Sequence, residues 1–225
     1  MELKLTFDIE STSPKPINLI LDILDWHNYK AIFFVPAKIL DSSPAIFLKI
    51  RNKGHEIGLH GYKHERFDML NQQEKQKILE KSIKIYKSLF KTAPECFRAP
   101  QFSADFELLN LLEELKFKYD SSIVQFPISQ AIFFPSKISL YLKHLKFNHY
   151  INKHNLKIKE MPVSSFIFPI SMLSLRLLPL FIFKILSSLS LIFRRDKKIV
   201  FLAHSYEFDT KNLNKFKKFL ISVKK

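Results

Sequence analysis

Two histidines stand four residues apart in the stretch "HGYKH", His60 and His64, and all three glycines of the chain lie in or just before it. This spacing fits both imidazoles on one face of a helical turn and suits two nitrogen ligands of a zinc-like ion, which a carboxylate would complete. Glycine is chosen where the backbone needs a positive φ or a close approach. We therefore expect Gly54 to end a helix, and Gly58 and Gly61 to shape the chain around the first ligand.

Further ionisable side chains follow short apolar stretches that are typical of β-strands. They are Asp8, Glu10, Arg98, Asp120 and His204. The carboxyl ends of parallel strands meet at one edge of a sheet, where α/β folds assemble their sites. Several separate strand ends would thus each deliver an ionisable group to one edge of the sheet.

Each of these residues also has a purely structural interpretation. Asp8 could cap the turn that begins in "STSP", and Arg98 could be an ordinary salt-bridged arginine. A lone histidine at a strand end, such as His204, is more often structural than catalytic. Ser205 lacks the glycine turn of a serine hydrolase. The ordered set, rather than any one member, indicates catalysis.

The alternation of apolar and amphipathic stretches predicts parallel strands joined by helices. Strands are expected within residues 3–8, 30–37, 55–60, 96–100, 118–122, 156–164 and 198–205. Helices are expected over residues 13–28, 71–90, 103–117 and 210–225, the third with Ser103 or Asp105 as its N-cap. Seven strand units indicate a barrel, or a sheet bent into one, as a single domain over residues 1–225.

Two segments fit this alternation poorly. Residues 124–155 show no clean period, and we interpret them as an irregular excursion from the barrel. Residues 166–193 form an apolar run long enough to span a bilayer, but Arg176 and Lys184 lie near its middle and prolines interrupt it. We expect a buried helix there, or one that lies against a membrane surface.

Composition narrows the class of protein. The chain is 47% hydrophobic and 14% aromatic, which excludes a disordered protein. Its net charge of +15 favours polyanionic neighbours, namely nucleic acid, an anionic membrane face or phosphorylated substrates, unless lysine is simply its default surface residue. The single cysteine, Cys96, excludes an internal disulfide. The opening residues do not resemble a secretory signal, so we expect a cytoplasmic protein, either free or peripheral at the inner face of the membrane.

Five motifs, in order over nearly the whole chain, resemble those of the polysaccharide deacetylase family, also called the NodB homology domain or carbohydrate esterase family 4. They are "TFDIE", "GHEIGLHGYKH", "FRAP", "YDSS" and "FLAHSYEF". The resemblance implies a distorted (β/α)7 barrel and a metal-dependent N-deacetylase. The opening motif is similar to the Asp-x-Glu branch, whose members act on lipid-linked sugars or on small amides. Gln101 stands where many members carry an aromatic residue.

The resemblance implies a role for each site residue. Asp8 would be the general base, held ionised by a charge-assisted hydrogen bond from Arg98. Glu10, His60 and His64 would bind a divalent metal, with Zn²⁺ as the first choice.

The resemblance also implies that His204 is the general acid, which would protonate the leaving nitrogen. Asp120 would lie near His204 and orient its ring or tune its pKa. A backbone N–H near Gln101 would help to bind the oxyanion. The predicted reaction removes an N-acetyl or N-formyl group from an amino sugar, in a cell-envelope glycan or in a lipid-linked or nucleotide-linked precursor.

Two other functions compete with this one. A metal-dependent amidase acting on a small soluble amide or cyclic imide keeps the fold and the metal. A non-catalytic protein that binds nucleic acid or an anionic surface through residues 141–158 needs no metal, but the chain holds no nucleic-acid motif, so we expect no nucleic-acid partner. A deacetylase inactivated by its altered opening motif is a lesser alternative. The sequence predicts no oligomeric state.

Overall fold

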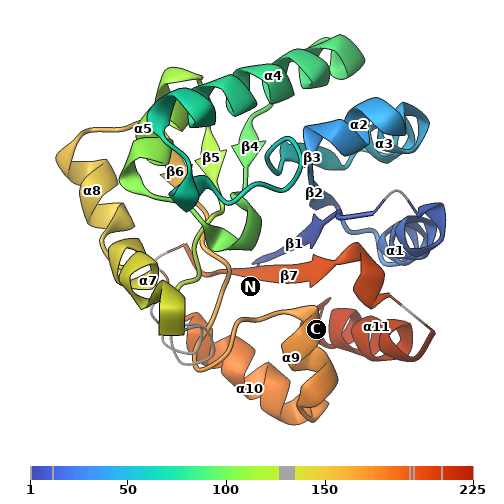
Figure 1. The fold of residues 1–225 in the computed structure, drawn as a ribbon. Helices are drawn as coiled ribbons and strands as arrows, with labels where there is room; N and C mark the ends of the chain where they lie inside the picture. Colours follow the sequence, from blue (N-terminus) through green and yellow to red (C-terminus); the bar gives the residue numbers. More distant parts are fainter. Residues whose placement is uncertain are drawn as a thin grey trace.

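Seven parallel strands form one sheet in the order β6-β5-β4-β3-β2-β1-β7 in the computed structural model, which describes residues 2–11, 13–126, 135–192, 194, 196–208 and 210–224. The strands are β1 (Glu2–Asp8), β2 (Ala31–Val35), β3 (Glu56–Leu59), β4 (Cys96–Phe97), β5 (Tyr119–Asp120), β6 (Lys159–Glu160) and β7 (Lys198–His204). The sheet curls, and helices surround it (Figure 1). The predicted α/β fold, a distorted (β/α)7 barrel, is confirmed.

The barrel is distorted because its strands are unequal. β1 and β7 pair over seven residues, whereas β4, β5 and β6 have only two residues each. The chain that follows β6 lies along the free edge of β7, where Ser164 N–H donates to the Val200 carbonyl at 3.0 Å and Leu202 N–H donates to the Ile170 carbonyl at 3.0 Å. This irregular segment takes the place of a continuous β6–β7 ladder.

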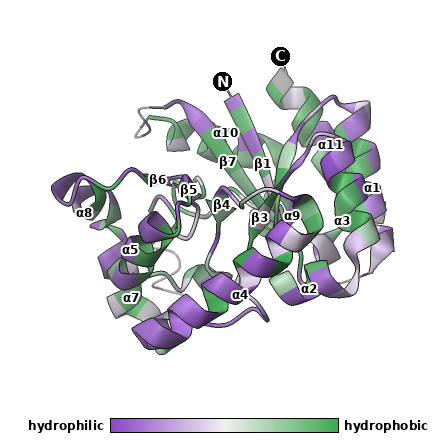
Figure 2. Ribbon diagram, turned by 90° about the horizontal axis from the view of Figure 1, so that it is seen from above, coloured by the Kyte–Doolittle hydropathy of each residue, from purple (hydrophilic) through white to green (hydrophobic). Residues whose placement is uncertain are grey.

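The longer helices form where the sequence predicts them. They are α1 (Pro14–Trp26), α4 (Gln72–Phe90), α5 (Phe106–Glu114) and α11 (Thr210–Lys224), with α2 (Ala37–Ser42) and α3 (Pro44–Asn52) between β2 and β3. α4 begins with a capping box in which Asn71 and Glu74 each accept the other's backbone N–H. Asp105, rather than Ser103, caps α5. α4 mixes hydrophilic and hydrophobic residues along its length, as a helix with one buried face does (Figure 2).

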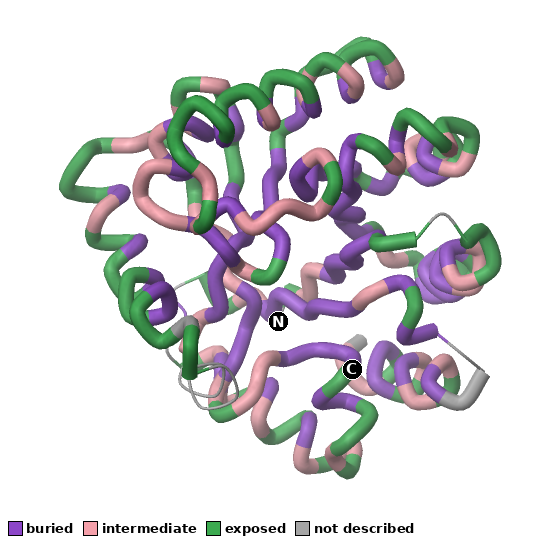
Figure 3. The backbone as a smooth tube through the Cα atoms, viewed as in Figure 1, coloured by how far each residue is buried: buried purple, intermediate pink, exposed green. Residues whose placement is uncertain are grey.

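Phenylalanine builds the core between the sheet and its helices. The Phe7 and Phe33 rings stack at 5.2 Å across β1 and β2, and Phe201 of β7 stacks on Phe219 of α11 at 5.4 Å. The strands are buried along most of their length, while the outward faces of the helices are exposed (Figure 3). This packing holds the strand ends, and the side chains they carry, in one place.

The interpretation of residues 124–155 as irregular is wrong for its second half. Two short helices, α7 (Ile138–His144) and α8 (Phe147–Lys153), form there. Each buries only two or three side chains, Phe147 among them, and two turns are too few for a helical period to stand out in the sequence. The first half includes residues 127–134, which lie outside the described residues.

The apolar run at residues 166–193 folds into two helices, α9 (Met172–Leu177) and α10 (Leu180–Ser190). Pro179 separates them because a proline cannot continue the helix that precedes it. Among the helices described, none has the length and hydrophobicity needed to cross a bilayer. Phe193, the last residue of the run, lies outside the described residues.

Candidate active site

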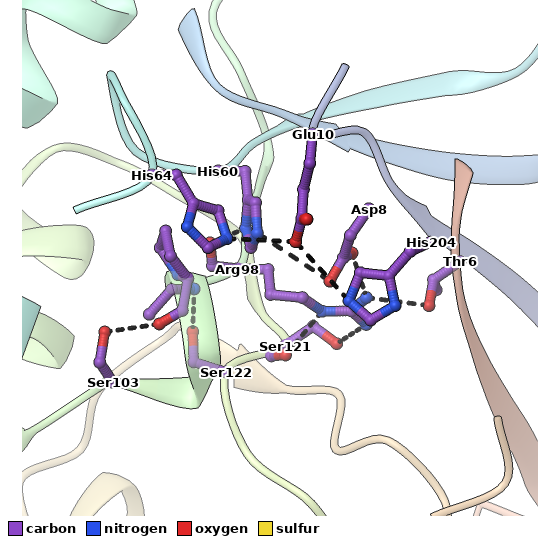
Figure 4. A network of polar contacts seen from close by, with 12 residues as sticks. Thr6, Asp8, Glu10, His60, His64, Arg98, Ser103, Ser121, Ser122 and His204 are labelled. Carbon is purple, nitrogen blue, oxygen red and sulfur yellow. Dashed lines mark hydrogen bonds and ion pairs between the residues drawn. The ribbon is translucent and has the colours of Figure 1, made fainter. Parts of the chain in front are cut away.

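Six of the seven predicted site residues meet at the carboxyl edge of the sheet (Figure 4). Asp8, Glu10, His60, His64, Arg98 and His204 line one cavity of about 70 Å³, together with Ala99, Gln101 and Phe102. They come from β1, β3, β4 and β7 or from the residues just after these strands. Convergence of strand ends that are distant in sequence is what a parallel α/β sheet provides.

Three of these side chains form a candidate metal centre. A carboxylate oxygen of Glu10 and ring nitrogens of His60 and His64 all lie within 4.8 Å of one another. Nε2 of His64 is 3.3 Å from Oε1 of Glu10. The hydrogen bond from His64 lowers the pKa of Glu10, which keeps this carboxylate ionised. Two imidazoles and one carboxylate suit a divalent ion such as Zn²⁺ and leave coordination positions open.

His60 is prepared to act as a metal ligand. Its Nδ1 lies 2.7 Å from the backbone carbonyl of Arg98, an acceptor, so the ring proton is on Nδ1 and the Nε2 lone pair is free for a metal. Burial lowers the pKa of His60 to about 4, so the imidazole is neutral at neutral pH. A neutral ring with a fixed tautomer is what metal binding requires. The residues present therefore fit a divalent metal.

The structure corrects the local geometry predicted for the histidine pair. His60 and His64 do not share a helical turn: the chain from residue 60 to residue 66 is a loop. It reverses through positive φ angles at Gly61 (73°) and His64 (71°), and the Glu65 carboxylate accepts the backbone N–H groups of Tyr62 and Lys63 at 2.9 Å. The two imidazole rings still come within 5.0 Å of each other.

Gly58 is required by a close contact rather than by its φ angle. A β-carbon at this position would lie 2.7 Å from the Phe34 ring and 3.1 Å from the Cys96 carbonyl oxygen. The Phe34 ring in turn lies under the guanidinium of Arg98, 4.2 Å from its centre. The glycine of β3 therefore lets Phe34 support Arg98 from below.

Arg98 is fully buried and holds the end of β1. Its Nη1 donates to Oδ1 of Asp8 at 2.7 Å and to Oγ1 of Thr6 at 3.0 Å. Its Nε and Nη2 donate to the backbone oxygen and the hydroxyl of Ser121, at 3.0 and 2.7 Å. Four of the five N–H groups of the planar guanidinium thus donate to β1 or to Ser121, the residue after β5.

This arrangement keeps Asp8 ionised. Burial alone would raise the pKa of Asp8, but the charge of Arg98, with smaller contributions from His60 and His204, lowers the pKa below its usual value. The second oxygen, Oδ2, lies 4.0 Å from Nε2 of His60. Asp8 is therefore a carboxylate with one oxygen held by Arg98 and the other beside the candidate metal centre.

His204 has a partner that the sequence analysis missed. Nδ1 of His204 lies 3.3 Å from Oε2 of Glu207, which also accepts the His204 backbone N–H at 2.7 Å. Burial would lower the pKa of His204, but the hydrogen bond to Glu207 and the charges of Asp8 and Glu10 outweigh burial and raise it. The only signal in the sequence was an acid three residues after the histidine.

Asp120 is not among the residues that line the cavity, and the structure gives it contacts other than the predicted one to His204. Asp120 is fully buried and lies opposite Glu160 of the neighbouring strand β6. Its Oδ1 accepts the hydroxyl of Ser122, whose oxygen accepts the Ala99 backbone N–H at 2.7 Å. Through Ser122, Asp120 therefore supports the backbone at Arg98 and Ala99, while Nδ1 of His204 lies beside Glu207.

The loop after β4 forms part of the wall of the cavity. Gln101 and Phe102 have positive φ angles of 55° and 54°, which is unusual for residues other than glycine and often marks a functional site. Both line the cavity. Gln101 stands where an aromatic residue was expected from the resemblance, and Phe102 supplies an aromatic ring from the next position.

The cavity opens beside a larger hollow. This hollow of about 510 Å³ shares Glu10 and His64 with the cavity and is otherwise lined by Pro36, Lys38, Ile39, Tyr62 and Lys63. The inner cavity, at about 70 Å³, has room for a water and a small acyl group but not for a sugar ring. A substrate larger than a small amide would therefore have to extend into the outer hollow.

Comparison with known proteins finds a family model and relatives that match part of this chain. A family model described as polysaccharide deacetylase matches residues 2–119. A peptidoglycan deacetylase-like protein of Gibberella zeae is 38% identical over 94 residues, and a peptidoglycan-N-acetylglucosamine deacetylase of Bacillus cereus is 38% identical over 103 residues. These matches cover 42% and 44% of this chain and only 28% and 36% of the two relatives, so the chain matches about a third of their length.

A known crystal structure has a similar fold. The crystal structure of a putative polysaccharide deacetylase from Mycobacterium smegmatis superposes with a TM-score of 0.65 over 98% of this chain and 83% of that one. The two sequences are 19% identical, so this similarity concerns the fold alone.

Proposed function

The chain belongs to the polysaccharide deacetylase family, and on this basis we propose that it is a metal-dependent hydrolase that removes the N-acetyl group from an amino sugar. The observation that carries this proposal is the convergence on one cavity of a Glu-His-His ligand set, the carboxylate of Asp8 and the imidazole of His204. These are the groups that amide hydrolysis needs, arranged within reach of one another.

Glu10, His60 and His64 would hold the metal, with Zn²⁺ proposed as the ion. When bound, a divalent ion polarises a carbonyl oxygen and lowers the pKa of a water molecule. The neutral His60 and the ionised Glu10 are already in the protonation states that such binding requires.

Asp8 acts as the general base in this proposal. Arg98 holds Oδ1, so Oδ2 is the oxygen that accepts a proton from the attacking water. The lowered pKa of Asp8 keeps it able to do so at neutral pH and below.

His204 acts as the general acid. Its raised pKa favours the imidazolium, and Glu207 holds the ring through Nδ1 so that Nε2 carries the transferable proton. Nε2 lies on the side of Glu10, 3.7 Å from its carboxylate, and so faces the candidate metal centre. Protonation there would release the amine of the sugar.

The outer hollow indicates the kind of sugar. Lys38 and Lys63 bring two cationic side chains to a hollow whose carboxylate, Glu10, belongs to the metal centre. We propose that they bind a negatively charged substituent, as a phosphate in a lipid-linked or nucleotide-linked amino sugar would be. A neutral small amide would fill only the inner cavity and leave both lysines unused.

Elemental analysis combined with a deacetylation assay tests the proposed function. The purified protein should contain about one divalent ion per chain, and His60→Ala and His64→Ala should lose it while they keep their circular dichroism spectra. The wild type should release acetate from N-acetylglucosamine 1-phosphate more efficiently than from a neutral chitooligosaccharide, and Lys38→Ala/Lys63→Ala should remove this preference.

Each alternative function predicts a different result in these two measurements. A wild type that takes up no zinc, manganese or cobalt would overturn the proposal and favour a non-catalytic binding protein. Bound metal with turnover of a cyclic imide but not of any N-acetyl sugar would favour the amidase. Bound metal without turnover of any amide would indicate an inactivated deacetylase.

A further inference from the structure

We propose that α9 and α10 dock this protein onto an anionic lipid bilayer. Both helices bury one face against the rest of the molecule, through Met172, Leu175 and Phe183. Their outward face is also apolar. Its large side chains are Leu173, Leu177, Phe181 and Ile185, exposed by 55, 75, 65 and 54%. We call these four residues the docking surface.

The docking surface differs from the outward face of α4. Leu173 and Leu177 lie one turn apart on α9, and Phe181 and Ile185 lie one turn apart on α10, so each pair lies on one side of its own helix. Phe181 and Ile185 also line an open hollow of about 680 Å³ on α10, beside Lys184. The outward face of α4, by contrast, carries lysines at positions 77, 81, 84 and 87. A helix with apolar residues on both faces is typical of a buried or membrane-bound helix.

The charge of the two helices identifies what binds to the docking surface. α9 and α10 contain two basic residues, Arg176 and Lys184, and no aspartate or glutamate, within a chain of net charge +15. Arg176 and Lys184 are exposed on the same two helices as the docking surface. Apolar side chains beside exposed cations suit the interface of a bilayer that contains anionic lipids.

The same charges disfavour a second copy of this chain. In a two-fold interface centred on the docking surface, Arg176 and Lys184 of one copy would face those of the other, and the two helices have no acid to pair with them. A lipid headgroup, in contrast, supplies the missing negative charge.

The docking surface is connected to the strand that carries His204. Ser171, the N-cap of α9, pairs with Leu202 of β7, and Leu202 N–H donates to the Ile170 carbonyl at 3.0 Å. Leu202 is two residues from His204, so α9 begins close to the carboxyl edge of the sheet. Figure 1 shows α9 and α10 together on the β7 side of the barrel. Given the proposed function, docking through α9 and α10 would bring a lipid-linked sugar to the active site. The binding of the protein to the bilayer does not itself depend on catalytic activity.

Vesicle co-sedimentation tests the proposal. The wild type should bind vesicles of phosphatidylcholine with phosphatidylglycerol and release them at high salt. Leu177→Ser/Phe181→Ser should bind at least ten-fold more weakly, on the order expected for two exposed apolar side chains that enter the interface. Arg176→Gln and Lys184→Gln should each weaken binding about five-fold. Trp26→Ser is the matched control: its side chain is 85% exposed on α1, and its loss should change nothing.

A fluorescence measurement reports contact at the proposed surface itself. Trp26 is the chain's one tryptophan, so Phe181→Trp in a Trp26→Phe background places a single reporter on α10. Its emission should shift to the blue with anionic vesicles and be quenched by brominated lipids.

Three results would overturn the proposal: no binding to anionic vesicles, equal binding to vesicles of phosphatidylcholine alone, or a concentration-dependent blue shift without lipid, which would indicate self-association. Deacetylation of a soluble substrate should be the same in wild type and Leu177→Ser/Phe181→Ser. Lost docking with retained activity would count against this inference alone, and retained docking without activity would count against the proposed function alone.

Discussion

Arg98 and Asp8, 90 residues apart in the sequence, form a buried ion pair with a hydrogen bond of 2.7 Å at the carboxyl edge of the sheet. The guanidinium satisfies Thr6 and Ser121 with its other donors and packs on Phe34. These contacts hold the guanidinium in position beside Asp8. Arg98 thus links β1, β4 and the residue after β5, and the position of Asp8 depends on all three.

Arg98→Lys tests this pair, because lysine keeps the charge and loses the fork. We expect kcat to fall by about 100-fold or more, on the order seen when a positioned electrostatic group is removed. Since the charge of Arg98 lowers the pKa of Asp8, Arg98→Met, which removes that charge, should raise the pKa, and the acid limb of its pH–rate profile should move to higher pH. An unchanged acid limb would mean that Asp8 is not the base whose titration limits activity.

Glu207→Gln tests the partner of His204. The Glu207 hydrogen bond is the largest of the influences that raise the pKa of His204, so its loss should lower that pKa. His204 must be protonated to donate, and activity is lost as pH rises through its pKa. The alkaline limb should therefore move to lower pH in this variant. Glu114→Gln, at the exposed end of α5, is the control and should leave the profile unchanged.

Glu10→Gln tests the third ligand of the candidate metal centre. The amide keeps the shape of the side chain but removes the charge that a divalent ion favours. We expect zinc affinity, measured by competition with a chromophoric chelator, to fall at least ten-fold, and chelator treatment to inactivate the variant sooner than the wild type. Equal affinity in both proteins would assign the site to His60 and His64 with another donor.

Glu160→Gln tests the buried acid pair through the pH dependence of stability. Burial and the neighbouring Asp120 raise the pKa of Glu160 well above its usual value. A raised pKa in the folded state contributes stability that is complete below the unfolded pKa, about 4.3, and is lost as pH rises toward the folded one.

For this one group the loss is about 1.4 kcal/mol of unfolding free energy per pH unit within that window. Urea unfolding from pH 4 upward should show the glutamine variant gaining stability relative to the wild type as pH rises. Parallel curves for the two proteins would show that Glu160 ionises normally in the fold. Glu114→Gln, an exposed acid on α5, serves as a control for the loss of a carboxylate.

Much of the fold and of the site could be predicted because it depends on local patterns. The alternation of short apolar runs with amphipathic stretches located all seven strands and four of the helices. Asp8, His60, Arg98 and His204 were found because each follows such a run, and parallel strands carry their carboxyl ends to the same edge. The glycines around His60 predicted a constrained backbone, which Gly58 and Gly61 confirm.

The sequence by itself thus determined which residues reach the carboxyl edge of the sheet, since that depends on where each strand ends. Only the tertiary structure decided which of them are partners. Asp120 pairs with Glu160, and His204 with Glu207, because strand order and the turn after β7 set those distances. His64 reaches His60 through a loop with positive φ angles rather than a helix. Such contacts depend on groups far apart in the chain, and no local periodicity records them.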